Sequence, residues 1–160
     1  MTVEASEFKN ALQLWASGVT VVTTQSERFG LQGMTATSFS SVSLDPPQVL
    51  VCINERADTG EGIEESQHFA VNILTAKQEQ VSNEFAGKAS QEDRFRNVSW
   101  SQGKEGMPLL DDSLASLECR VLQKVKAGTH WIIVGEVNNV VCREGDPILY
   151  YSTGYRKLTA

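Results

Sequence analysis

The sequence is poor in the residues that build disulfide frameworks and metal centres. Only three cysteines, Cys52, Cys119 and Cys142, occur among its 160 residues. They are odd in number, widely spaced and free of any C-x-x-C motif, which favours reduced thiols over a disulfide scaffold. The two histidines, His68 and His130, belong to no recognisable metal-ligand motif. We therefore expect no metal site.

Long apolar runs and an excess of positive charge are also missing. No apolar run approaches the roughly 20 residues that a membrane-spanning helix needs. Residues 1–7 contain two glutamates and no basic stretch of the kind that opens a secretory signal, so we expect a cytoplasmic location. The formal net charge of −6 argues against a nucleic-acid partner, because phosphate contacts need clustered Lys and Arg.

Motifs for several common chemistries are absent as well. The chain has no G-x-S-x-G elbow, which argues against a serine hydrolase. It has no G-x-G-x-x-G or Walker loop, so Rossmann-type and P-loop nucleotide binding are unsupported. The acid pairs Glu64-Glu65 and Asp111-Asp112 are typical of solvated surfaces.

Side-chain hydroxyls, in contrast, are concentrated in one segment. Six of them fall within nine residues: Thr35, Thr37, Ser38, Ser40, Ser41 and Ser43. Because each hydroxyl both donates and accepts hydrogen bonds, such a strand suits a flat heterocycle with carbonyls, a ring N–H and a phosphate tail. The alternative is an exposed strand that is simply rich in Ser and Thr.

The hydrophobic pattern predicts a fold dominated by β-strands, with peripheral helices. Apolar residues at 8, 11, 12 and 15 predict an amphipathic helix over 6–16, with Trp15 in the core. Thr75 and Gln78 form a capping box for a helix over 76–86, which Gly87 ends. Gly60 and Gly62 indicate a loop, and 88–108 reads as irregular. Strands are expected at 19–24, 33–44, 48–53, 69–74, 117–121, 130–142 and 148–151. We expect one domain over 1–160, an antiparallel barrel.

The order of several motifs resembles the flavin reductase-like domain family. Within it, the chain is most similar to the short-chain NAD(P)H:flavin reductases that serve two-component aromatic monooxygenases. The motifs are W-A-S-G-V-T-V-V-T-T at 15–24, G-M-T-A-T-S-F at 33–39, S-V-S-L-D-P-P at 41–47, F-A-V-N-I-L at 69–74, F-A-G at 85–87, D-R-F at 93–95, G-T-H at 128–130 and I-I-V-G-E-V at 132–137. They cover nearly the whole chain.

This resemblance implies an FMN-binding split barrel with Greek-key-like antiparallel strands, forming a homodimer. The implied activity is hydride transfer from NADH or NADPH to FMN or FAD, with release of the reduced flavin to a partner monooxygenase. One alternative is a protein that keeps FMN or FAD as a prosthetic group for electron transfer or storage. Another is a split barrel whose pocket has adapted to a different flat ligand, such as haem.

The resemblance also implies which residues bind the cofactors. Those expected at the flavin are Met34, Thr35, Ala36, Thr37 and Ser38 near the ring and ribityl chain, Ser41, Val42 and Ser43 near the phosphate, Cys52, Asn54 and Arg56 in the following loop, Phe85, Ala86 and Gly87 beside the ring, and Tyr155. Arg56 is the expected cation for the flavin phosphate. His130 matches a histidine that lies by the nicotinamide, although Thr129 replaces the acidic residue that precedes it in relatives.

Three of these assignments have structural alternatives. His130 could be a turn or core histidine that makes one hydrogen bond. The segment Asp93-Arg94-Phe95 could hold a local surface ion pair instead of a cofactor contact. Tyr155 and Arg156, near the C-terminus, could form a dimer contact instead of a ligand contact.

Overall fold

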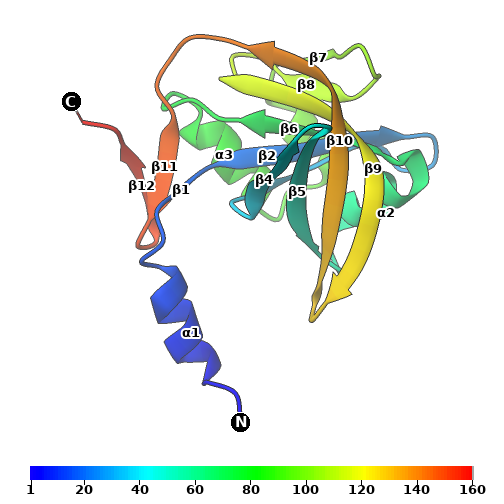
Figure 1. Cartoon of the computed structure of the whole chain (residues 1–160). Helices are drawn as coiled ribbons and strands as arrows, with labels where there is room; N and C mark the ends of the chain where they lie inside the picture. Colours follow the sequence, from blue (N-terminus) through cyan, green and yellow to red (C-terminus); the bar gives the residue numbers. More distant parts are fainter. Residues whose placement is uncertain (160) are drawn as a thin grey trace.

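Antiparallel sheets dominate the computed structural model, which describes residues 1–159. Seven strands form the main sheet in the order β3-β2-β6-β9-β10-β5-β4, while β1-β11-β12 and β7-β8 form two smaller sheets (Figure 1). The elements are α1 (Ala5–Leu12), β1 (Ser17–Gly18), β2 (Thr20–Ser26), β3 (Gly30–Ala36), β4 (Phe39–Leu44), β5 (Pro47–Asn54), α2 (Asp58–Ser66), β6 (His68–Ile73), α3 (Glu79–Ala86), α4 (Gln91–Arg96), β7 (Trp100–Gln102), β8 (Pro108–Leu110), β9 (Ala115–Ala127), β10 (His130–Cys142), β11 (Ile148–Tyr151) and β12 (Gly154–Lys157). The predicted mostly-β class is confirmed.

The hydroxyl-rich segment forms two strands instead of one. β3 and β4 follow each other directly in the chain, with only Thr37 and Ser38 between them, yet they occupy opposite edges of the main sheet. The sheet must therefore roll up so that its two edges approach each other. Thr37 and Ser38 connect the two edges along the chain, and the Ser38 carbonyl accepts a hydrogen bond from the Cys52 amide of β5 at 3.1 Å.

The interior of the rolled sheet is packed with side chains from alternate positions on its strands. Val22, Val51 and Phe69 are fully buried there and belong to one apolar cluster. A second cluster, which includes Phe85 and Phe95, lies under α3 and α4. Together the two clusters fix the sheet against its helices.

Two segments that the sequence analysis assigned to loops contain helices. α2 replaces the loop expected around Gly60 and Gly62, and it packs tightly on the sheet. A Cβ at Gly62 would lie 2.2 Å from Gln32 Oε1 and 2.9 Å from Thr24 Cγ2, so glycine is needed for this close approach and does not loosen the segment. The second helix, α4, lies within the stretch expected to be irregular, and begins after Ser90, whose hydroxyl accepts the Asp93 amide.

The N-terminal helix was predicted, but its surroundings were not. α1 ends at Leu12, and Figure 1 shows it standing away from the sheets. Its apolar residues are exposed: Phe8 by 57%, Leu12 by 55% and the following Trp15 by 78%. The expectation that Trp15 lies in the core is therefore wrong for the single chain.

The helix expected over 76–86 is observed as α3. The helix begins only at Glu79, however, and its N-cap residue is Gln78 instead of the predicted Thr75. The Gln78 side chain accepts the Thr75 amide at 2.9 Å, and Gly87 follows the last helical residue. The predicted long hairpin is also confirmed as β9 and β10. Among residues 1–159, no helix combines the length and hydrophobicity needed to cross a membrane.

Candidate functional site

One group of predicted site residues lies on the outer face of the main sheet. Along β5, Val49, Val51 and Ile53 are buried, so the alternate residues Cys52 and Asn54 point outward. His130 of β10 is the register partner of Asn54, and Ser38 lies beside Cys52. We call residues 38–43, 52–56 and 130 the open half of the site.

The polar groups of the open half are half-buried or exposed. The Ser38 hydroxyl donates to the Cys52 carbonyl at 2.8 Å, and the Asn54 side chain accepts the Arg56 amide at 2.9 Å. His130 Nδ1 lies 3.0 Å from the Thr129 hydroxyl. The exposed Arg56 guanidinium forms no ion pair within residues 1–159, which leaves its charge available to an anion.

The rest of β4 is equally open to solvent. A bulge between Ser41 and Ser43 interrupts its pairing with β5 and leaves Val42 46% exposed. Ser41 is exposed and Ser43 is half-buried, while Thr37 is exposed at the crossing from β3. This part of the predicted phosphate segment therefore lies at a free edge of the sheet.

A second group of predicted residues is held by bonds between β3, α3 and β12. The Thr35 hydroxyl donates to the Ser82 carbonyl at 2.6 Å. The Ser82 hydroxyl lies 2.8 Å from the Tyr155 hydroxyl, which also donates to Asn83 Oδ1 at 2.8 Å. Tyr155 thus ties the C-terminal hairpin to α3. We call residues 33–35, 82–87, 91, 94 and 155 the clamped half of the site.

Three predicted contact residues turn their side chains into the core. Phe85 is 1% exposed and Ala36 is 7% exposed, and Met34 packs against the apolar cluster inside the sheet. The Phe85 ring meets Phe95 edge to face, with 5.1 Å between ring centroids. These three side chains lie beneath the site, whereas Ala86 at the end of α3 and Gly87 directly after it are exposed.

Gly33 allows the Phe85 ring of α3 to pack closely against β3. A Cβ at this position would lie 2.7 Å from the Phe85 ring and 3.3 Å from Thr23 Cγ2. The ring cannot move aside, because it is fully buried against Phe95. Glycine therefore lets α3 lie directly on β3.

Sequence reasoning missed the role of α4. The Arg94 guanidinium donates to the carbonyls of Gly33 (2.7 Å), Gly87 (2.8 Å) and Ala89 (3.1 Å). The Gln91 side chain accepts the Gly33 amide at 2.8 Å. In the sequence, only the D-R-F motif pointed to this segment. The motif does not indicate which carbonyl groups the arginine side chain bonds.

The surface ion pair expected at this motif exists, but it uses a different arginine. Arg96 bonds Asp93 at 2.9 Å and Glu92 at 2.7 Å, both within α4. Arg94 makes neither contact. The two arginines of one short helix therefore have separate roles, one on the solvent side and one on the backbone of the site.

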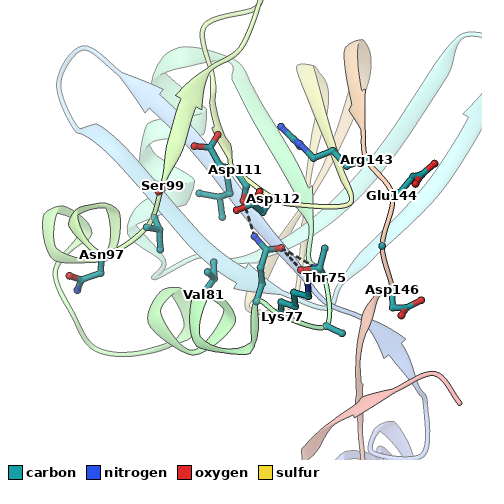
Figure 2. A pocket seen from close by; sticks show the side chains of 15 residues that line it. Thr75, Lys77, Val81, Asn97, Ser99, Asp111, Asp112, Arg143, Glu144 and Asp146 are labelled. Atoms are coloured by element: carbon teal, nitrogen blue, oxygen red, sulfur yellow. Dashed lines mark hydrogen bonds between the residues drawn. The ribbon is translucent and has the colours of Figure 1, made fainter.

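A cavity of about 740 Å³ at the beginning of α3 lies apart from both halves. Its walls include Lys77, Val81, Asp111, Arg143 and Asp146, and Figure 2 shows how charges of both signs project there. None of the residues predicted for the flavin lines it. Within residues 1–159, no three His, Cys, Asp or Glu side chains are grouped so that they could hold a metal ion.

Proteins with similar sequences and folds include flavin reductases. A Rhodococcus protein described as an NADH-dependent flavin reductase is 42% identical over 152 residues, which are 94% of this chain and 84% of that protein. The flavin reductase component BorF of a bacterial two-component tryptophan halogenase is 32% identical with a TM-score of 0.90, and the match covers 98% of this chain and 99% of BorF.

One similar structure was solved with its ligands. It is an NADH:FAD oxidoreductase of Streptomyces globisporus in complex with NAD and FAD fragments, with 32% identity, a TM-score of 0.91 and coverage of 99% of this chain and 97% of that one. The profile of the flavin reductase like domain matches residues 12–159. The chain therefore belongs to the flavin reductase-like domain family.

Proposed function

We propose that this protein is an NADH-dependent flavin reductase that reduces FMN or FAD and releases the product to a partner oxygenase. The proposal rests on one observation: the residues expected at the flavin form two groups on the fold of this family, the clamped half and the open half. The Rhodococcus relative and the Streptomyces structure are both named for NADH, which favours NADH over NADPH as donor. BorF is named as the reductase component of a two-component system, which favours a separate oxygenase partner.

The residues present fit a flavin. The hydroxyls of Thr35 and Ser38 already donate to main-chain carbonyls, so their lone pairs remain free to accept from a ring N–H or a ribityl hydroxyl. The free guanidinium of Arg56 suits a phosphate. His130 sits at the rim beside Asn54, where its ring can donate to a nicotinamide carboxamide or a diphosphate.

Such a site needs no protein acid, nucleophile or metal. Hydride passes from the nicotinamide C4 to the flavin N5 when the two rings stack at roughly 3–3.5 Å with correct alignment. The contribution of the chain is to bind and orient the two rings and to exclude water. Both halves of the site suit this task, because one is rigid and the other presents free polar groups.

We also propose a homodimer with a split-barrel fold, in which a second copy completes the site. Half-buried Leu50, Ile132 and Val134 point outward beside the open half. The apolar side chains of Phe8 and Trp15 likewise have no cover in one chain. Burying these surfaces against a second copy removes apolar area from water and closes the open half.

The remaining features agree with one cytoplasmic domain over 1–160. The C-terminal hairpin is bonded to α3 through Tyr155, and β1 near the N-terminus pairs with β11 near the C-terminus. Cys52, Cys119 and Cys142 are free thiols, which a reducing compartment preserves.

Anaerobic mixing with NADH and excess free flavin tests the activity. A reductase bleaches many equivalents of added FMN or FAD per protein. A protein that keeps flavin as a prosthetic group bleaches at most its own bound flavin, and oxidises little NADH or NADPH. A haem protein shows an intense Soret absorbance when purified or reconstituted.

The role of Arg56 is tested by comparing FMN with riboflavin, which lacks the phosphate. Arg56→Ala should weaken FMN binding about 10-fold or more, because a charge-assisted bond is lost, and should leave riboflavin binding unchanged. Arg96→Ala is the matched control, since Arg96 pairs with acids on α4. Equal losses for the two ligands would remove Arg56 from the phosphate site.

A further inference from the structure

The outer edge of β3 is covered by side chains instead of by another strand. β3 ends the main sheet, so one side of its backbone has no strand partner within residues 1–159. Gly33 directs its amide and carbonyl to that side, and both are bonded by α4: the amide by Gln91 and the carbonyl by Arg94. Residues two apart in a strand direct their backbone groups to the same side, so those of Thr35 face this edge too.

Arg94 also holds the turn that follows α3. Its guanidinium reaches Gly87, the last residue of the F-A-G segment, and Ala89 two residues later. One planar group therefore bridges the strand that leads to Thr35 and the turn over 87–89 that follows α3. A guanidinium suits this bridge, because its N–H donors are fixed in one plane and it stays charged at any physiological pH.

We propose that Gln91 and Arg94 are positioning residues, which set the separation between the β3 edge and the turn after α3 and so pre-form the clamped half for the flavin. The inference rests on the proposed function, since it assigns both residues to the same site. Neither residue needs to touch the flavin. A pre-formed site binds more tightly, because the ligand does not have to order the two segments itself.

The contrast between the two arginines of α4 separates this role from a general need for charge on the helix. Arg96 makes only side-chain ion pairs, and its side chain is 63% exposed. Arg94 bonds only to main-chain carbonyls, of which those of Gly33 and Gly87 belong to the clamped half. Loss of Arg96 should therefore leave the site unaffected, whereas loss of Arg94 frees two of its segments.

Substitutions at 91, 94 and 96 test the proposal in the full-length protein. Arg94→Lys keeps the charge but cannot bridge three carbonyls, and we expect it to raise the Kd and KM for FMN about 10-fold. Because the chemistry is untouched, kcat at saturating FMN should stay within about 2-fold. The same measurements with FAD cover the other flavin. Arg96→Met is the matched control and should leave Kd, KM and kcat unchanged.

Gln91 provides an independent pair of variants. Gln91→Ala removes the acceptor for the Gly33 amide and should raise the Kd for FMN about 3- to 5-fold. Gln91→Glu keeps an acceptor oxygen at the same position and should restore binding to within about 2-fold of the wild type. A residue that served stability alone would change the melting temperature without this pattern of loss and rescue.

The outcomes distinguish the inference from the proposed function. A wild-type protein that neither binds FMN or FAD nor oxidises NADH with them would refute the proposed function. An active wild type, with Arg94→Lys and Gln91→Ala binding both flavins normally at a lower melting temperature, would overturn only the positioning role. If the Arg94 variants do not fold, the comparison of Gln91→Ala with Gln91→Glu decides the question.

Discussion

The two halves of the candidate site differ in where their polar groups find partners. In the clamped half, Thr35, Ser82, Tyr155 and Arg94 bond to one another's segments within the chain. In the open half, the Arg56 guanidinium faces solvent beside an uncovered apolar surface. The contacts within one chain therefore fix only part of this candidate site. The rest requires the ligand and, in our proposal, a second copy.

Breaking the clamped half from within should have the largest effect. Gly33→Ala places a methyl group against the buried Phe85 ring, and we expect it to lower the free energy of unfolding by about 3 kcal/mol. Gly18→Ala is the control, because a Cβ there meets nothing within 4 Å. Denaturant unfolding of both variants measures the difference. Equal stabilities would show that Phe85 can move aside.

Breaking the open half should affect assembly instead of folding. Leu50→Asp puts a carboxylate in the proposed dimer interface, and we expect the dimer dissociation constant to rise at least about 100-fold, with loss of flavin reduction. The stability of the separate chain should change little, because Leu50 is only half-buried in it. Gln25→Asp adds the same charge on β2, where Gln25 is exposed. Sedimentation velocity across a concentration series gives the answer, and a monomeric wild type would contradict the dimer.

His130 is the residue of the open half that we expect to act on NADH instead of on the flavin. His130→Ala should lower kcat/KM for NADH about 10-fold while flavin affinity stays unchanged, because one hydrogen bond to the dinucleotide is lost. His68→Ala is the control, since the His68 ring bonds Ser66 O at 2.8 Å on another part of the sheet. Stopped-flow reduction at saturating flavin separates the two. An unchanged NADH dependence with a lower melting temperature would make His130 a structural residue.

The seryl hydroxyls of the open half should differ from one another. Ser38→Ala should weaken flavin binding by about 1 kcal/mol, because a neutral hydrogen bond is lost. The exposed Ser40, whose hydroxyl donates to Ser41 O, provides the control through Ser40→Ala. Titration of flavin fluorescence measures both variants. Equal effects would mean that position along this segment does not matter.

Thiol labelling should show the smallest effects. Burial, together with the neighbouring Glu118 carboxylate, raises the pKa of Cys119 to about 12, so this thiol stays protonated and unreactive at pH 8. Exposed Cys142 should label readily, and half-buried Cys52 more slowly. Excess FMN should slow labelling at Cys52 alone. Mass spectrometry of each modified cysteine would reveal a contrary order.

The strands were predictable because they follow local patterns in the sequence. The helices α2 and α4, which were assigned to loops, were not predictable in this way. The long β9–β10 hairpin follows from apolar alternation and a Gly-containing turn. α2 was missed because its glycines weaken helix propensity, and only the distant Gln32 and Thr24 explain why Gly62 is there. Trp15 was assigned to the core because it lies on the apolar face of an amphipathic pattern. Such a pattern predicts that the face is buried, but it does not show whether the same chain or another molecule buries it.

The candidate site was predictable to a similar extent. The hydroxyl-rich segment and the family motifs assigned particular stretches of chain to the flavin, but they could not predict which side chains in those stretches face outward. Phe85 and Ala36 lie within those stretches and are buried, whereas Arg94 reaches Gly33 from a segment that looked irregular. These contacts depend on how β3 and α4 pack against each other. Packing between segments that are far apart in the chain produces no periodic pattern in the sequence.

The position of β5 between β4 and β10 has a consequence for synthesis on the ribosome. β5 ends at Asn54, but β10, its partner on the inner side of the sheet, begins only at His130. At a translation rate of about 5–20 residues per second, β5 emerges several seconds before β10 exists to pair with it. During that interval the apolar run Val49–Ile53 presents an unpaired strand edge, which is a template for aggregation. Nascent chains stalled before β10 should therefore depend on chaperones far more than the finished protein does.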